Sequence, residues 1–310
     1  MASLMLVANP AASQFTGGAH RDILHILSAR HKVEAVWPRS ALHARDIAAD
    51  AVTAGFDGVI AMGGDGVVHQ VAQALVGTEV FMGVVPAGTT NVFARQIGLP
   101  DKPVKAARHL GGEINLSRMA VVEVESTHPD GTSSVSDALF AIGVGMDAEV
   151  VAAAETEPYR KYRFGGIHYA RTALSLLWRD IRRRRPGLTA RQDDRTAPAV
   201  AVMVQFHSAF TYFGHRPLKF EPAHPDPMTA LVIRALPWRR APAVLRHLVS
   251  SSLEKVSGIE VWSHVSQMTV EADPPALHEV DGEVLGQITR VILTFRPDAL
   301  WVAVPPHRPS

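Results

Sequence analysis

The chain has 310 residues, a length that favours two domains over one. Its formal net charge of +1 provides no global attraction for nucleic acid, which we therefore do not expect as a partner. The absence of cysteine excludes disulfides, thiolate zinc sites and cysteine nucleophiles, and it fits the reducing cytoplasm in which we expect the protein to act.

Up to residue 100 the sequence alternates strand-like and helix-like patterns. Strands are predicted at residues 4–8, 33–37, 59–62 and 80–85, and helices around residues 23–27, at 41–54 and 67–75, and between residues 90 and 98. Strands that alternate with helices through short glycine-rich connections predict a parallel, doubly wound sheet, and hence an α/β fold.

The pattern changes near residue 118. Short strands separated by turns are predicted at residues 119–125, 138–144, 199–206, 229–235, 259–261, 267–271 and 289–295. Two helices, at about 168–184 and 241–255, interrupt them, and the polar stretch 185–198 is interpreted as an exposed loop. Many short strands with turn residues between them favour a β-sandwich or a barrel.

A glycine-rich turn, Gly63-Gly64-Asp65-Gly66, follows the predicted strand at 59–62 and opens a helix. Glycines let backbone N–H groups approach an anion, and the helix start adds the positive end of its dipole. The carboxylate of Asp65 would repel bare phosphate, so its useful role would be through Mg²⁺ or a ribose hydroxyl. The alternative is architectural, because any α/β fold needs glycines where a strand turns into a helix.

A second such turn, Pro86 to Asn91, follows the next predicted strand and supplies hydroxyls and an amide, among them Thr89. Neighbouring parallel strands end at the same edge of a sheet, where open α/β folds bind ligands. Neither turn is a Rossmann fingerprint or a Walker A loop. The pair of turns therefore favours a phosphate-rich ligand over architecture alone.

Several ordered motifs resemble the diacylglycerol kinase catalytic domain family, which includes bacterial lipid kinases and sphingosine kinases and is related to NAD kinases and phosphofructokinases. The motifs are Asn9-Pro10, the two glycine-rich turns with their continuation to Arg95, the segments 145–150 and 161–169, and Asp281-Gly282-Glu283. The likeness extends over nearly the whole chain.

The resemblance implies an N-terminal ATP-binding domain of the NAD kinase and phosphofructokinase type at residues 1–118, to which a final strand within 298–310 returns. It also implies a C-terminal β-sandwich at 119–297 that presents a lipid substrate. Asp65 is the candidate ligand of Mg²⁺. The residues expected to hold ATP are Asn9, Pro10, Gly63, Gly64, Asp65, Gly66, Gly88, Thr89 and Asn91.

The catalytic candidates are Asp281 and Glu283, of which one would accept the proton of the substrate hydroxyl. Two residues apart, both would point to one face of a regular strand. The alternative is that Asp-Gly forms a hairpin turn, which the pattern alone favours. The two interpretations can hold together, and the resemblance places these carboxylates at the reacting centre.

The chain departs from the family at several positions. His69 and Gln70 stand where an Asn-Glu pair is usual, and the segment 226–230 lacks the family's Asp-Gly. Val67 stands where a threonine is usual, and Val92 and Asn115 stand where acidic residues are usual. Beside an ATP-dependent lipid kinase, these three residues keep open a nucleotide- or lipid-binding protein that has lost catalysis. The related fold keeps open a second alternative, an NAD-kinase-like enzyme with a soluble acceptor.

A basic run, Arg182 to Arg185, closes the helix predicted at 168–184. Arginines at a helix C-terminus suit the helix dipole, which is the ordinary explanation. The sharper hypothesis is a docking patch for anionic lipid headgroups at the inner face of the membrane. We also expect that the protein can form a homodimer.

Overall fold

The computed structural model describes residues 1–145, 148–149, 187–213, 216–218, 227–234, 247, 252 and 255–306. The helix predicted at 168–184, the basic run Arg182 to Arg185 and the motif segment 161–169 lie outside these residues, as does most of the helix predicted at 241–255. The chain divides into two compact units: Met1–Val121 with Pro297–Ser310, and Val122–Arg296.

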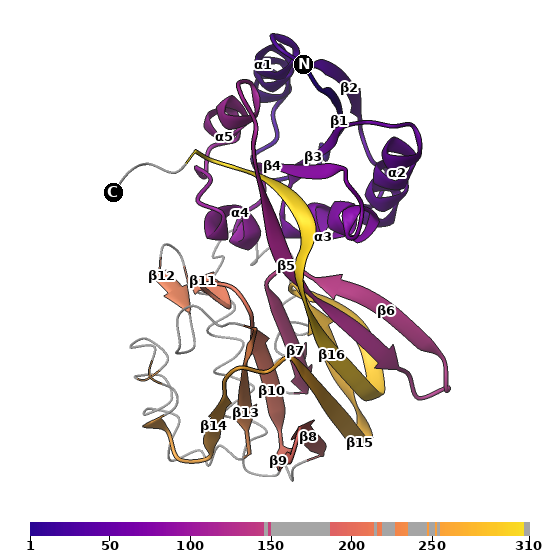
Figure 1. Ribbon diagram of the computed structural model, residues 1–310, viewed down its shortest axis with the longest axis vertical. Coiled ribbons are helices and arrows are strands. Elements are labelled where there is room, and N and C mark those ends of the chain that lie inside the picture. The colour runs from indigo at the N-terminus through magenta and orange to yellow at the C-terminus, as the bar shows by residue number, and fades with distance from the viewer. Residues whose placement is uncertain are drawn as a thin grey trace. The chain divides into compact units, whose positions relative to one another are not determined.

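The first unit is a parallel sheet covered by helices (Figure 1). Its strands follow the order β4-β3-β1-β2, and the end of β16 joins β4 in parallel through Val302 and Met82. Helices α1 and α5 pack together, as do α2 and α3. The elements are β1 (Ser3–Ala8), α1 (Gly17–Ser28), β2 (Lys32–Val36), α2 (Ala41–Thr53), β3 (Gly58–Gly63), α3 (Asp65–Leu75), β4 (Phe81–Pro86), α4 (Val92–Gln96) and α5 (Pro103–Leu110).

Local sequence signals account for most of this unit. Strands β3 and β4 are buried along their whole length, as short apolar runs between two helix layers must be. The side chains of Thr16 and Ser40 cap α1 and α2 by accepting backbone N–H groups of the first turn. Helix α5 was not predicted; it begins at Pro103, which suits the first helical position, where no N–H donor is needed.

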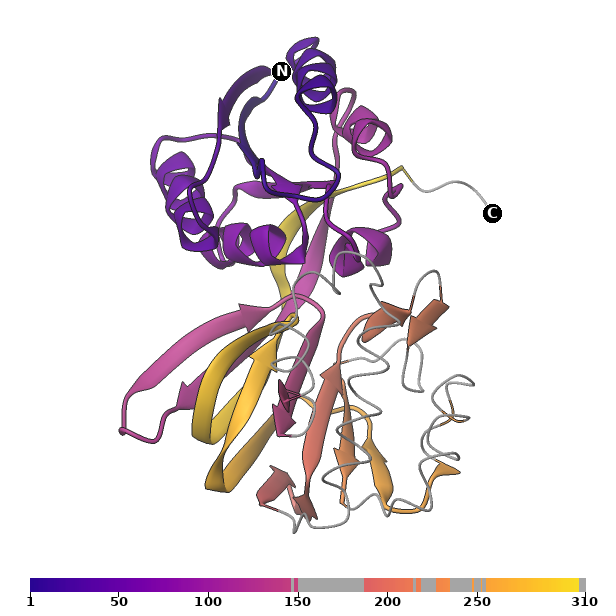
Figure 2. The ribbon, with the colours of Figure 1, turned by 180° about the vertical axis from the view of Figure 1, so that it is seen from behind.

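The second unit is antiparallel and β-rich, with strands in the order β14-β13-β10-β7-β15-β16 (Figure 2). Strand β5 pairs with β16 and β6, and β8 pairs with β15 and β9. Among the described residues no helix is long and apolar enough to cross a membrane. The strands are β5 (Asn115–Thr127), β6 (Ser133–Ala138), β7 (Ala141–Gly145), β8 (Leu188–Gln192), β9 (Arg195–Ala199), β10 (Ala201–Gln205), β11 (Thr211–Phe213), β12 (Arg216–Leu218), β13 (Thr229–Ile233), β14 (Ile259–Trp262), β15 (Gln267–Val280) and β16 (Glu283–Val304).

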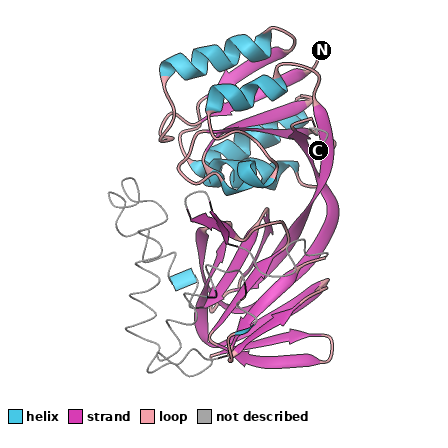
Figure 3. Cartoon of the chain, turned by 90° about the vertical axis from the view of Figure 1, so that its left-hand side faces the viewer, coloured by secondary structure: helices cyan, strands magenta, loops and turns pink. Residues whose placement is uncertain are grey.

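The core of this unit is built from alternate residues of its strands, including Ile142, Val202 and Val270. Figure 3 colours the helices and strands of the chain, and the described part of the second unit consists almost entirely of strands. Together the two units give the predicted fold class, an α/β domain and a sheet-rich domain. Strand β16 is much longer than the predicted segment 289–295, because its first part pairs with β15 and its last residues pair with β4.

The stretch 185–198 is not a loop where the structure describes it, and that prediction is wrong. Strands β8 and β9 form a hairpin in which Leu188, Ala190 and Ala197 are buried in the core. The turn between them uses Asp193 with a φ of 48°, a conformation that aspartate tolerates. Alanine is too small to give a clear period-two pattern, so the polar residues on the other face dominated the sequence.

Candidate functional site

The first glycine-rich turn connects β3 to α3 through close packing. A Cβ atom on Gly63 would lie 2.8 Å from the Cβ of Val67, so this position has no room for a side chain. Val67 is 5% exposed, and its methyl groups fill the space beside Gly63. The valine that departs from the family pattern therefore serves as a packing residue at the base of the turn.

The second turn connects β4 to α4 and lies directly against the first. A Cβ on Gly88 would come within 2.5 Å of the Cα of Gly64, a contact between backbones that cannot move aside. The backbone N–H of Ala87 also donates to the carbonyl of Gly63, at 2.8 Å. The sequence predicted that the two turns would be neighbours, and the structure brings them into contact.

Asn91 fixes the shape of the second turn. Its Oδ1 accepts the N–H of Gly88 at 2.9 Å, and its Nδ2 donates to the carbonyl of the same residue at 3.0 Å. The side chain is 3% exposed, and the residue adopts a φ of 50°, which asparagine tolerates better than most residues. Thus Asn91 acts as a clamp on the Gly88 backbone.

The loop after β1 completes the site. The N–H of Asn9 donates to the carbonyl of Met62, and its Oδ1 accepts the N–H of Ala11, which shapes the turn that contains Pro10. Sequence reasoning missed two residues further along this loop, Ser13 and Gln14. No sequence signal marks them, because their partners lie 74 and 76 residues away along the chain.

Ser13 and Gln14 tie this loop to the second turn. The backbone N–H of Gln14 donates to the carbonyl of Ala87, and its Nε2 donates to the carbonyl of Gly88, both at 2.8 Å. The hydroxyls of Ser13 and Thr89 lie 3.4 Å apart. The carboxyl ends of β1, β3 and β4 thus carry one connected surface of backbone amides, hydroxyls and side-chain amides, all within the first unit.

Asp65 has a structural contact within this surface. Its Oδ1 accepts the N–H of Phe93 at 3.2 Å and so caps the start of α4. In the part of the chain that the structure describes, no group of three or more histidine, aspartate or glutamate side chains could hold a metal ion. A carboxylate has more than one acceptor site, so this cap is compatible with a role of Asp65 beside a Mg²⁺ that is held mainly by nucleotide phosphates.

Asp281 lies in the second unit, in the two-residue turn between β15 and β16, where it has a φ of 55° and Gly282 a φ of 80°. Its carboxylate is buried and accepts three backbone N–H groups, from Leu139 at 2.8 Å, Phe140 at 2.9 Å and Ala141 at 3.1 Å. The hairpin interpretation describes the local structure. Asp281 therefore links the turn between β15 and β16 to the connection between β6 and β7.

Glu283 begins β16 just after this turn and is half-buried, paired across the hairpin with Val280. Nearby, Glu279 accepts the N–H of Gly282 through Oε2 at 2.7 Å. The expectation that Asp281 and Glu283 share one face of a regular strand fails, because Asp281 belongs to the turn. The catalytic role of either carboxylate stays a prediction.

A buried histidine supports the same hairpin. His278 is 0% exposed, and burial lowers its pKa below the ordinary value, so the ring is neutral near pH 7. Its Nδ1 lies 3.0 Å from the carbonyl of Gly286, which can only accept, so Nδ1 carries the proton. Its Nε2 then accepts the hydroxyl of Ser126 at 3.0 Å.

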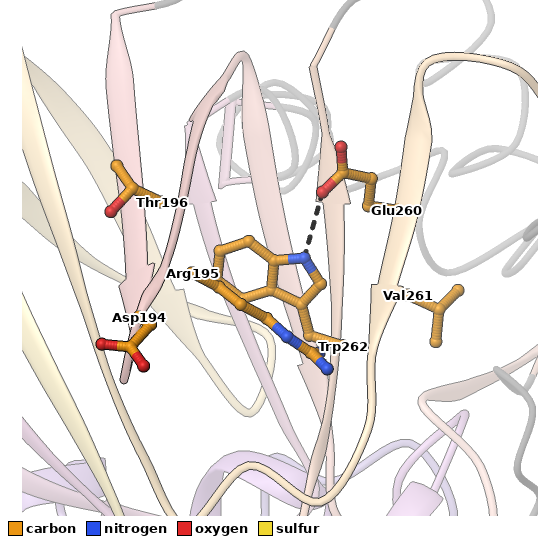
Figure 4. A pocket seen from close by; sticks show the side chains of 6 residues that line it. All are labelled: Asp194, Arg195, Thr196, Glu260, Val261 and Trp262. Atoms are coloured by element: carbon orange, nitrogen blue, oxygen red, sulfur yellow. Dashed lines mark hydrogen bonds between the residues drawn. The ribbon is translucent and has the colours of Figure 1, made fainter.

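A groove of about 530 Å³ lies in the second unit, between the β8–β9 hairpin and β14 (Figure 4). The indole N–H of Trp262 donates to Glu260 at 3.1 Å, and Glu260 also pairs with Arg234 at 2.8 Å. The residues that line the groove are Asp194, Arg195, Thr196, Glu260, Val261 and Trp262. None of the residues predicted from the sequence is among them.

Comparison with known proteins identifies a family whose domain is similar to the first part of the chain. Residues 3–124 match the diacylglycerol kinase catalytic domain. This match covers the glycine-rich turns and the loop after β1, and it confirms the resemblance for the motifs up to Arg95.

Two curated relatives illustrate how far the sequence likeness extends. A diacylglycerol kinase of Mycobacterium tuberculosis (strain H37Rv) is 52% identical over 64 residues, which are 21% of each chain. A probable YegS-like lipid kinase of Pseudomonas aeruginosa (strain UCBPP-PA14) is 32% identical over 135 residues, which are 43% of this chain and 40% of that protein. The matched region thus spans less than half of these relatives.

Solved structures extend the likeness in fold to the whole chain. A putative diacylglycerol kinase from Bacillus anthracis aligns over 98% of this chain and 97% of its own, with a TM-score of 0.73 and 19% identity. An NAD kinase from Archaeoglobus fulgidus in complex with ATP aligns with a TM-score of 0.51 and 14% identity, over 98% of this chain and 93% of its own. At these identities the alignments show the fold, and they confirm the predicted fold class.

Proposed function

We propose that the protein is an ATP-dependent kinase that transfers the γ-phosphate to a hydroxyl of diacylglycerol or a related lipid. The observation that carries the proposal is the connected surface at the carboxyl ends of β1, β3 and β4, within the segment that matches the diacylglycerol kinase catalytic domain. Phosphoryl transfer requires positioning, neutralisation of charge and an acceptor for the hydroxyl proton, and the chain offers candidates for each.

In this proposal the two glycine-rich turns hold the phosphates. Backbone amides of the turns can donate to phosphate oxygens, and Thr89 and Ser13 add hydroxyls at the same edge. The segments 9–18, 63–70 and 86–92 contain no lysine or arginine. The site therefore relies on neutral donors, and a bound Mg²⁺, with Asp65 as its protein ligand, would supply the positive charge.

Glu283 is the residue we assign as proton acceptor. Asp281 accepts three backbone N–H groups, which limits its capacity to accept a further proton donor from a substrate. Glu283 adjoins this anchored turn at the start of β16. The anchored Asp281 then positions Glu283, and Glu283 accepts the proton of the lipid hydroxyl.

The test is transfer of labelled phosphate from ATP, with Mg²⁺, to diacylglycerol, sphingosine, ceramide, phosphatidylglycerol and NAD. We expect transfer to one lipid, a loss of about 10²–10⁴-fold in rate for Glu283→Gln, and unchanged transfer for Glu271→Gln. Glu271 is a suitable control because it pairs with Arg191 on the exposed part of β15. Equal rates for both variants would remove Glu283 from the mechanism.

The same panel separates the alternative functions. Structural likeness to a yeast NADH kinase complexed with NADH (TM-score 0.53, 12% identity) favours a soluble dinucleotide acceptor as the second candidate. Transfer to NAD alone would identify that activity. Binding of ATP without any transfer would identify a protein that has lost catalysis, the alternative suggested by Val67, Val92 and Asn115.

The lipid substrate places the proposed reaction at a membrane surface. The basic run Arg182 to Arg185 supports peripheral contact with anionic lipids at the inner face of the membrane, and this part of the proposal rests on the sequence alone. Flotation with anionic vesicles tests it: association that weakens with salt supports the contact, and absence of association at low salt contradicts it. The expected homodimer remains a prediction, which sedimentation can check.

A further inference from the structure

Three aromatic rings gather at the edge of the first unit next to the proposed phosphate site. The rings belong to Phe15, His20 and Trp37, which we call the aromatic trio. Their centroids are 5.7 Å apart for Phe15 and His20, 6.2 Å for Phe15 and Trp37, and 5.8 Å for His20 and Trp37. Neither the proposed function nor the motifs of the sequence account for this cluster.

The indole of Trp37 is the outermost ring of the trio. It is 57% exposed, whereas Phe15 is half-buried and packs against the core of the first unit. The planes of Trp37 and its two partners meet at 86° and 76°, so neither partner ring lies flat on the indole. The indole N–H points to Nε2 of His20 at 3.5 Å, which orients the ring by its edge. An oriented aromatic ring, more than half exposed, is thus held at the surface.

The trio is continuous with the glycine-rich turns. Trp37 directly follows β2, and the parallel register pairs Val36 with Val7, so Trp37 lies at the same edge of the sheet as the loop after β1. Within that loop, Phe15 directly follows Gln14, whose side chain donates to the carbonyl of Gly88. Neighbouring Cα atoms are about 3.8 Å apart, so the trio begins one residue from the phosphate site.

We propose that Trp37 is the platform on which the base of the bound nucleotide stacks while its phosphates lie on the glycine-rich turns. This inference rests on the proposed function, which requires a nucleotide, and it adds the chemistry that selects the base. A large aromatic face recognises the π-surface of a base and not its hydrogen-bonding edge. The platform therefore favours purine nucleoside triphosphates as a class, with little distinction between adenine and guanine.

Two substitutions separate stacking from simple apolar contact. Trp37→Phe keeps an aromatic face, and Trp37→Leu keeps an apolar side chain without one. Binding of ATP, GTP, UTP and inorganic tripolyphosphate to each variant, measured by titration calorimetry with Mg²⁺, reports the contribution of the base. We expect Trp37→Leu to weaken ATP and GTP binding about 5- to 150-fold, the size of one base–aromatic contact.

We also expect Trp37→Phe to stay within a few-fold of the wild type, UTP to bind the wild type more weakly than ATP, and tripolyphosphate to bind all three proteins alike. Equal ATP affinity in the wild type and Trp37→Leu would overturn the platform. The platform would also be overturned if Trp37→Leu lost as much affinity for tripolyphosphate, which has no base, as for ATP. A wild type that binds no nucleotide would overturn it as well. Leu42→Ala serves as the control, since Leu42 is another exposed apolar residue of the same unit, at 65%.

The phosphate-transfer assay distinguishes failure of this inference from failure of the proposed function. Transfer to a lipid with an unchanged KM for ATP in Trp37→Leu would keep the kinase and remove the platform. ATP affinity that depends on Trp37, in a protein that transfers no phosphate, would keep the platform and remove the kinase. A raised KM for ATP with an unchanged kcat supports both.

Discussion

The substitution Asp281→Asn tests the structural role of this carboxylate directly. Asparagine tolerates a positive φ as well as aspartate does, so the φ of 55° adds no new backbone strain. The carboxylate accepts N–H groups from Leu139, Phe140 and Ala141, and an asparagine side chain would present an NH₂ group to at least one of these donors. At least one buried N–H then loses its partner.

The expected effect is large for a single isosteric change. A buried donor left without a partner costs about 1–3 kcal/mol, and each hydrogen bond to a charged group that is lost or weakened adds about 1.5–3 kcal/mol. We therefore expect a loss of about 2–5 kcal/mol in the free energy of unfolding. At about 2–4 °C per kcal/mol for a domain of this size, the melting temperature falls by roughly 4–20 °C.

Urea and thermal unfolding followed by circular dichroism measure this loss. Asp193→Asn is the matched control, because Asp193 also has a positive φ, of 48°, in the same unit, but is exposed. We expect the control to stay within about 0.5 kcal/mol of the wild type. An Asp281→Asn variant as stable as the control would refute the assigned hydrogen bonds. If it is destabilised, its loss of transfer does not identify a base, and Glu283→Gln carries that test.

Three further predictions concern the turns and the buried histidine. Gly88→Ala should abolish ATP binding, since its Cβ would lie 2.5 Å from the Cα of Gly64, whereas Gly112→Ala, outside both turns and with nothing within 4 Å, should bind normally in the same titration. Gln14→Ala should raise the KM for ATP several-fold in the transfer assay and leave the melting temperature nearly unchanged, because its exposed side chain holds the second turn through a single bond. Burial lowers the pKa of His278, so the unfolded chain takes up this proton at a higher pH than the folded chain does. Stability is therefore full above about pH 6.5 and falls on acidification towards the folded pKa, by at most about 1.4 kcal/mol per pH unit; urea unfolding from pH 7.5 to 5 should show this slope, and a His278→Gln variant with the same slope would contradict it.

The first unit could be predicted almost completely from the sequence, because its signals are local. A buried strand such as β3 is a short apolar run that ends in glycine, and α2 follows the cap residue Ser40 with helical spacing. Helix α5 was missed, although Pro103 is a favourable first residue of a helix. The β8–β9 hairpin escaped because alanines, which form its buried face, give no period-two contrast.

The residues of the candidate site also differ in whether local sequence signals mark them. The residues of the two turns were predictable, because glycine, threonine and asparagine after a strand are themselves the signal. Gln14 and the aromatic trio could not be predicted, because only the fold brings Gln14 to Gly88 and Phe15 to Trp37.

The two acidic motif residues show why sequence motifs do not determine roles. Asp65 caps α4 through the N–H of Phe93, and Asp281 anchors the connection that contains Leu139 and Phe140. In each case a short carboxylate satisfies backbone donors that would otherwise be left without partners in a turn. Since a structural role of this kind preserves the same residue as a chemical one, a motif match alone does not distinguish them. Backbone donors bound by a carboxylate therefore establish a structural role without excluding a chemical one, and the Glu283→Gln variant tests the proton acceptor proposed above.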